Sequence, residues 1–190
     1  MKPSASPLDA PPADEPAGDR EPFTGTDPET GALVLDRFLP YRLSVLSNTV
    51  SRSIARLYAD RFGITIPEWR VLAILGDSGP ATSAEICGRT AMDKVQVSRA
   101  IQRLTSARLV SRRTDPADRR RATIAMTAKG AAVYKEVVPL ALSREAILLD
   151  GFTAEERHLL DRLLDRLADR AGALAGPEDG PDGGAGGDSG

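Results

Sequence analysis

Cysteine, histidine and aromatic residues are scarce in this chain, and their scarcity excludes several classes of protein. The 190 residues include one cysteine, Cys87, and one histidine, His158. A disulfide within the chain and a cysteine-based metal cluster are therefore excluded. Acid–base and metal chemistry need converging histidine, cysteine or carboxylate groups. We expect no enzyme, no catalytic residue, no metal site and no cofactor.

Long apolar runs are also missing. No window approaches the roughly 18 apolar residues of a membrane span, and the N-terminus has no basic region followed by an apolar stretch. We expect a cytoplasmic protein without a membrane partner. Aromatic residues make up only 4% of the sequence, and abundant Ala, Leu and Arg favour helices over a sheet sandwich. The expected fold class is mainly α.

Charge is distributed unevenly along the chain. The formal net charge is -2, but both ends are acidic and the positive excess lies in the middle. Residues 82–135 contain 12 basic residues against 4 acidic ones. A basic stretch inside an acidic chain predicts a local surface for an anionic partner such as nucleic acid.

Composition divides the chain into a folded unit and two tails. Residues 1–32 are acidic and poor in large apolar groups, which predicts a disordered N-terminal tail. Residues 174–190 are rich in Gly and Asp and predict a flexible tail. We expect one domain over residues 33–173.

Helix start signals recur within this domain. A capping box pairs an oxygen-bearing side chain with Glu or Gln three residues later, and each pair predicts a helix N-terminus. The pairs are Thr65/Glu68, Thr82/Glu85, Asp93/Gln96 and Thr153/Glu156. The predicted helices are 36–62, closed by Gly63, and then 66–76, 83–89, 94–107, 128–149 and 154–172.

The pattern changes between residues 109 and 126. Val110 and the alternating residues 122–126 read as two short strands around a turn, residues 115–121, with concentrated positive charge. Short helices followed by a basic hairpin are the order of a winged helix-turn-helix, predicted here for residues 64–127.

The helix at 94–107 is the predicted recognition helix. Val97, Ile101 and Leu104 recur at helical spacing and predict a buried stripe. The other faces display amides, hydroxyls and cations that can contact base edges and phosphates in double-stranded DNA. The predicted DNA-binding residues of this helix are Lys94, Gln96, Ser98, Arg99 and Arg103.

The hairpin tip supplies the second predicted DNA contact. Arg119, Arg120 and Arg121 are adjacent and repel one another unless an anionic partner is present. A narrow minor groove has the negative potential to hold such a group, and Asp118 can orient a neighbouring guanidinium by a charge-assisted hydrogen bond.

The hairpin and the run after it resemble the MarR family (multiple antibiotic resistance regulators). Residues 115–121 followed by Ile124-Ala125-Met126-Thr127-Ala128-Lys129-Gly130 resemble the family's wing signature, with Met126 where Leu is usual. Residues 93–99 resemble the start of its recognition helix. The resemblance covers residues 35–172. It implies a repressor that binds an inverted-repeat operator as a homodimer and is released by a small-molecule effector.

The homodimer also has support from apolar patterning. Residues 159–170 place adjacent Leu pairs along one face of a helix. Together with helices 33–63 and 128–173, assigned here to dimerisation, this apolar surface exceeds what a small winged domain can cover.

The resemblance also implies an effector pocket beside the first two long helices. Cationic side chains there suit carboxylates or phosphates, and residues 41–48 and 67–70 are similar to a subgroup controlling aromatic-acid catabolism. The expected effector is an aromatic acid or its acyl-coenzyme A thioester. The candidate ligand residues are Tyr41, Arg42, Asn48, Arg52 and Trp69.

Two other interpretations of the sequence remain open. The basic face of a winged helix can bind an acidic protein instead of DNA. Cys87 can be a redox-sensing thiol, although a small buried side chain after Ile86 is the commoner role. His158, beside the leucines of the last helix, is expected to be a packing or interface residue.

Overall fold

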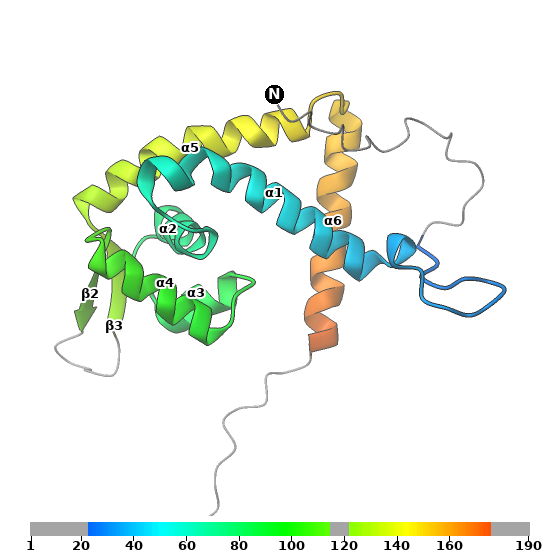
Figure 1. Ribbon diagram of the computed structural model, residues 1–190, viewed down its shortest axis with the longest axis horizontal. Helices are drawn as coiled ribbons and strands as arrows, with labels where there is room; N and C mark the ends of the chain where they lie inside the picture. Colours follow the sequence, from blue (N-terminus) through cyan, green and yellow to red (C-terminus); the bar gives the residue numbers. More distant parts are fainter. Residues whose placement is uncertain (1–22, 115–121, 176–190) are drawn as a thin grey trace, which may run out of the picture.

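The computed structural model describes residues 23–114 and 122–175. Within these residues helices dominate, and a small sheet lies at one end of the molecule (Figure 1). The helices are η1 (Leu35–Arg37), α1 (Leu39–Phe62), α2 (Ile66–Ser78), α3 (Ser83–Arg89), α4 (Lys94–Ser106), α5 (Ala128–Leu148) and α6 (Ala154–Ala175). The strands are β1 (Ala81–Thr82), β2 (Val110–Thr114) and β3 (Ala122–Met126). The predicted fold class, mainly α with a winged helix-turn-helix, is confirmed.

The first long helix begins later than predicted. Residues 35–37 form a short 3-10 turn, Phe38 is extended, and α1 starts at Leu39 with Pro40 in its first turn. Proline is tolerated there because the first backbone N–H groups of a helix have no partner within the helix, whereas in a helix interior it removes a hydrogen bond and kinks or breaks the helix. The helix ends as predicted at Gly63, which adopts a left-handed conformation with φ of 64°.

Residues 23–32, predicted to belong to a disordered tail, form a local turn instead. Asp27 Oδ1 accepts hydrogen bonds from the backbone N–H groups of Glu29 and Thr30 and from the Thr30 hydroxyl. These bonds hold the pKa of the Asp27 carboxyl below its usual value. Composition missed the turn because a side chain bonding to its own backbone needs no apolar core.

The predicted helix caps are present at the starts of α2, α3, α4 and α6. Both halves of the box form at Thr82 and at Thr153. At Thr65 the backbone N–H donates to Glu68 Oε2 at 2.7 Å. At α4 the Gln96 N–H donates to Asp93 Oδ1 at 2.7 Å. A further cap, not predicted, starts α5, where the Gly130 N–H donates to Thr127 Oγ1 at 3.0 Å.

The three strands form an antiparallel sheet in the order β1-β3-β2. The β2–β3 hairpin was predicted, but β1 was not. β1 pairs Ala81 with Ile124, and the next residue, Thr82, caps α3. A strand of two residues has no periodicity that could reveal it.

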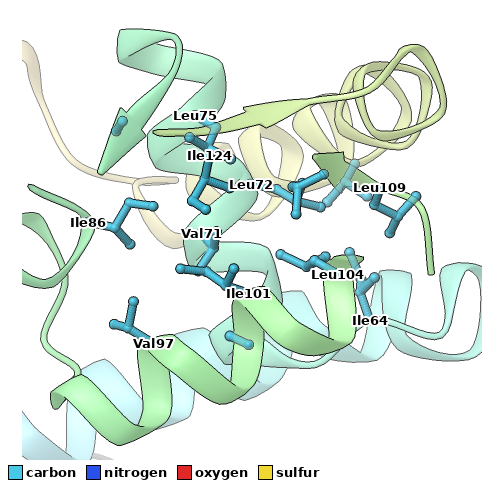
Figure 2. Close-up of a cluster of buried hydrophobic side chains, with 14 of the residues drawn as sticks. Ile64, Val71, Leu72, Leu75, Ile86, Val97, Ile101, Leu104, Leu109 and Ile124 are labelled. Atoms are coloured by element: carbon cyan, nitrogen blue, oxygen red, sulfur yellow. The ribbon is translucent and has the colours of Figure 1, made fainter. Parts of the chain in front are cut away.

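The core lies among α2, α3, α4 and the sheet (Figure 2). The stripe predicted on α4 is buried, with Val97, Ile101 and Leu104 at most 9% exposed. These side chains meet Val71 and Leu72 of α2, which are fully buried. The recognition helix is therefore fixed to its domain by apolar packing.

α5 joins this lobe through a close approach of two backbones. A Cβ atom on Gly130 would lie 2.0 Å from the carbonyl oxygen of Leu109. Two neighbouring side chains complete the joint, because Thr127 Oγ1 donates to the Arg108 carbonyl at 2.7 Å and Lys129 Nζ donates to the Ala107 carbonyl at 3.0 Å. The Thr-Ala-Lys-Gly run of the wing signature is therefore a structural clamp.

The other end of the molecule keeps its apolar side chains exposed. α5 continues through Pro139, and its buried residues, Gly130 and Val137, precede this proline. α6 lies at the end of α1 away from the winged lobe (Figure 1). The exposed apolar end, as we name it, consists of Tyr41, Leu43, Val45, Leu46, Leu142, Ile147, Leu148, Leu159, Leu160, Leu163 and Leu164.

The clamp predicts that even a methyl side chain at residue 130 lowers the stability of the fold. Gly130→Ala should lower the free energy of unfolding by about 1–3 kcal/mol, because the added methyl group collides with backbone that cannot rotate away. Gly88→Ala is the matched control, since nothing lies within 4 Å of its Cβ position. That change should raise stability by roughly 0.5–1 kcal/mol. Urea unfolding followed by helical signal measures both, and equal stabilities would contradict the clamp.

Candidate nucleic-acid interface

The outward face of α4 gathers the predicted base-reading side chains. Lys94, Gln96, Ser98, Arg99 and Arg103 are all exposed, opposite the buried stripe. The Asp93 cap orders the first turn of the helix. A rigid helix that presents amide, hydroxyl and guanidinium groups matches the donors and acceptors of the major groove.

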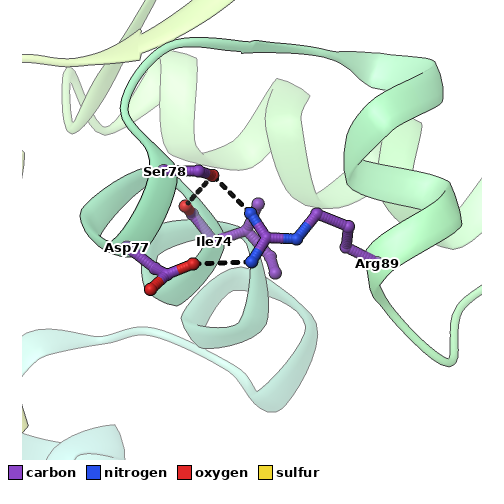
Figure 3. A network of polar contacts seen from close by, with 4 residues as sticks. All are labelled: Ile74, Asp77, Ser78 and Arg89. Atoms are coloured by element: carbon purple, nitrogen blue, oxygen red, sulfur yellow. Dashed lines mark hydrogen bonds and ion pairs between the residues drawn. The ribbon is translucent and has the colours of Figure 1, made fainter.

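A polar network on the lobe surface ties α2 to α3 (Figure 3). Arg89 donates one guanidinium nitrogen to Asp77 Oδ2 at 2.6 Å and another to the Ser78 hydroxyl. Ser78 in turn donates to the Ile74 carbonyl at 2.8 Å. The network joins the two helices against which α4 packs, although exposed ion pairs contribute only about 0–1 kcal/mol.

Arg103 differs from the other predicted DNA-binding residues of α4 because its guanidinium lies near a buried carboxylate. One of its guanidinium nitrogens lies 3.9 Å from Glu68 Oε1, and the Glu68 side chain is 6% exposed. A cavity of about 320 Å³ opens beside this pair, between the start of α2 and the side of α4. It is lined by Thr65, Pro67, Glu68, Gln96, Arg99, Ala100 and Arg103.

The predicted wing contacts, Asp118, Arg119, Arg120 and Arg121, lie outside the described residues. The described part of the hairpin adds two cations that sequence reasoning did not single out. Arg112 and Arg113 of β2 are exposed, and both belong to the basic stretch of residues 82–135. That stretch was the available signal for them.

Three aromatic rings connect the helices behind the lobe. Trp69 of α2 lies 5.8 Å from Tyr58 of α1 and stacks at 5.9 Å on Tyr134 of α5. Gly76 makes room for the third ring, since a Cβ there would lie 2.3 Å from Tyr134. This aromatic stack is the contact at which α1, α2 and α5 meet.

Comparison with known proteins identifies this arrangement. The model of the MarR family matches residues 62–121. The crystal structure of a MarR/EmrR family transcriptional regulator from Acinetobacter sp. ADP1 superposes with a TM-score of 0.69 at 26% identity, covering 74% of this chain and 99% of that one. The chain therefore resembles MarR-family regulators in sequence over residues 62–121 and in its fold.

Two further relatives are regulators as well. The transcriptional repressor NicR of Pseudomonas putida is 31% identical over 94 residues, which span 50% of this chain and 60% of NicR. Bordetella bronchiseptica BpsR, whose DNA binding is regulated by 6-hydroxynicotinic acid, matches with a TM-score of 0.61 at 26% identity. This match covers 68% of the chain and 98% of BpsR. These MarR-type relatives are transcriptional regulators and not enzymes, as predicted for this chain.

None of the five candidate effector residues lines the cavity beside Glu68 and Arg103. Tyr41, Asn48 and Arg52 are exposed along α1. The Arg42 guanidinium lies 5.4 Å from the centre of the Phe23 ring, a cation–π contact with the turn before α1. Trp69 belongs to the aromatic stack. The effector role of these residues stays a prediction.

Cys87 and His158 occupy unremarkable surroundings. Cys87 is half-buried against the core, which fits a small packing residue. His158 is exposed on α6, and its Nδ1 lies 2.8 Å from the Ala154 carbonyl of the same helix. No group of three metal-ligating side chains occurs in the described part of the chain, and none of its helices has the length and apolarity to span a membrane.

Burial of Tyr58 in the aromatic stack predicts a pH dependence of stability. Tyr58 is 1% exposed, and burial raises the pKa of its hydroxyl to about 12 from the ordinary value of 10.0. The unfolded chain therefore ionises this tyrosine first. Its contribution to the free energy of unfolding should be complete below about pH 10 and fall as the pH rises toward 12.

Tyr58→Phe isolates this effect because it removes the ionisable group and keeps the ring. The difference in unfolding free energy between the parent and the variant should be constant from pH 7 to 9. It should then shift in favour of the variant above pH 10. If the unfolding free energies of the two proteins differ by the same amount at every pH, the raised pKa of Tyr58 is contradicted.

Proposed function

We propose that this protein is a sequence-specific DNA-binding transcriptional regulator of the MarR family, and that it represses by occupying an inverted-repeat operator as a homodimer. The observation that carries the proposal is the two-sided character of α4. Its buried stripe fixes the helix to the lobe, and its opposite face exposes groups that can read bases. A winged helix that only bound an acidic protein would need the cations but not the amide and hydroxyl groups among them.

Positive charge on both α4 and the hairpin supports a duplex partner. Arg99 lies on the helix, Arg112 and Arg113 lie on β2, and three further arginines, 119–121, lie between β2 and β3 in the sequence. Cations on two adjoining elements can contact the major groove and the backbone beside it at the same time. We propose that the helix provides specificity and the hairpin mainly provides affinity.

Binding in a salt series tests this division. A duplex recovered by the protein from a random library, and a scrambled duplex of equal length, should differ in affinity by at least about 10³-fold. Arg99→Ala should reduce that ratio, because a good bidentate base contact discriminates by about 1–3 kcal/mol. Arg120→Ala should weaken both duplexes alike and lower the slope of log affinity against log salt by about 1 per subunit.

Arg56→Ala is the control, since it removes one exposed cation of α1 outside the basic stretch of residues 82–135. It should leave affinity, specificity and slope unchanged. A protein that selects no preferred duplex, or an Arg120→Ala variant with the parent's slope, would refute the proposal. The first result would favour the alternative, a module that binds acidic proteins.

The exposed apolar end supports the homodimer. Leu163 and Leu164 of α6 are 41% and 49% exposed, and Ile147 of α5 is 63% exposed. Large exposed apolar patches are rare on monomers and mark protein interfaces. A twofold pair would also place two copies of α4 on successive turns of DNA.

Placing charge on this surface tests the dimer. Leu163→Glu combined with Leu164→Glu should halve the mass measured by sedimentation and greatly weaken binding to the selected duplex. Both side chains are exposed in the single chain, so the helical content should be retained, as circular dichroism would show. A double variant that stays dimeric would exclude α6 from the interface.

The effector belongs to the same proposal. BpsR responds to 6-hydroxynicotinic acid, and we propose that a small aromatic acid, or its acyl-coenzyme A thioester, releases this chain from DNA. Arg42 and Arg52 of α1 are the cations expected to pair with its acidic group. Adding 6-hydroxynicotinic acid in the binding experiment above tests this ligand class, and unchanged affinity would exclude that acid.

A further inference from the structure

One apolar side chain on the outward face of α4 has no explanation within the fold. Val95 is 56% exposed at the second residue of the helix. Among the described residues from 47 to 141, no other large hydrophobic side chain is classed as exposed. The winged lobe otherwise buries its large apolar groups, and Val95 stands apart from the exposed apolar end.

Local structure does not favour valine here either. β-Branched residues are weaker helix formers than alanine, lysine or glutamine. The cap at Asp93 already satisfies the first turn, so the helix start needs nothing from this side chain. An exposed valine at this position adds no core packing and lowers helix propensity.

Val95 lies on the same face of α4 as two of the predicted base-contacting residues. Residues three and four apart share a helix face, so Val95 lies beside Ser98 and Arg99. Val97 and Ile101 point the other way, into the core. The rise of 1.5 Å per residue puts Val95 about 6 Å along the axis from Arg99. A duplex that contacts Arg99 would therefore meet Val95 at a neighbouring base pair.

The major groove has one apolar feature that depends on sequence, the C5-methyl group of thymine. We propose that Val95 is a specificity-determining residue that contacts this methyl group at one thymine in each half-site. The inference rests on the proposed function and adds to it a base identity near the position read by Arg99. It predicts that the operator half-site contains a thymine whose methyl group matters.

Removing the methyl group from DNA and the side chain from the protein tests the contact from both sides. In the duplex selected by the parent protein, each thymine is replaced singly by deoxyuridine, which keeps every hydrogen bond and loses only the methyl group. The parent should bind about two- to fivefold more weakly at one position per half-site, as expected for one buried carbon.

Val95→Ser should abolish that sensitivity and bind the thymine and deoxyuridine duplexes equally. Val95→Thr keeps one methyl group and should retain part of the sensitivity. Gln102→Ala is the control, because Gln102 is exposed on α4 but lies seven residues further along, and it should discriminate as the parent does. The exposure of Val95 means that Val95→Ser should fold normally, which its unfolding curve will show.

The outcomes distinguish the contact made by Val95 from DNA binding as such. If the parent selects a duplex but Val95→Ser keeps every thymine preference of the parent, the inference is overturned and DNA binding stands. If the parent selects no duplex at all, the proposed function fails, and the inference fails with it.

Discussion

The contact between Gly130 and the Leu109 carbonyl constrains the rest of the structure. It brings the first turn of α5 against the segment that connects α4 to β2. With the hydrogen bonds of Thr127 and Lys129, the recognition helix, the hairpin and α5, which runs to the other end of the molecule, meet at one point. This contact leaves little freedom, because the atoms in contact belong to the main chain and no side-chain rotation can separate them.

The molecule has two ends with opposite physical character. The winged lobe buries its large apolar side chains in one core and exposes cations, amides and hydroxyls. Beyond Pro139 this relation is reversed, and leucines and isoleucines of α5 and α6 are exposed. A single chain therefore removes large apolar side chains from water at one end and leaves them exposed to water at the other.

Local signals predicted the helices well because the caps are local chemistry. Thr82 and Glu85 bond to each other's backbone and side chains, so four residues of sequence suffice to place the start of α3. β1, the Gly130 clamp and the aromatic stack depend on residues distant in sequence, and no pattern reveals such contacts. Periodicity predicted which face of α4 is exposed. It did not single out Val95, because the fractional exposure of a side chain cannot be read from one sequence. The late start of α1 is a local feature too, because Pro40 fits only the first turn of a regular helix without cost.

The aromatic stack gives the molecule an intrinsic optical reporter. Trp69 is the only tryptophan of the chain, and it lies within 6 Å of the rings of Tyr58 and Tyr134. Light absorbed by either tyrosine can pass to the indole at such a separation. Its emission therefore depends on how α1, α2 and α5 are packed together. A rearrangement between the lobe and the long helices would change fluorescence without any label.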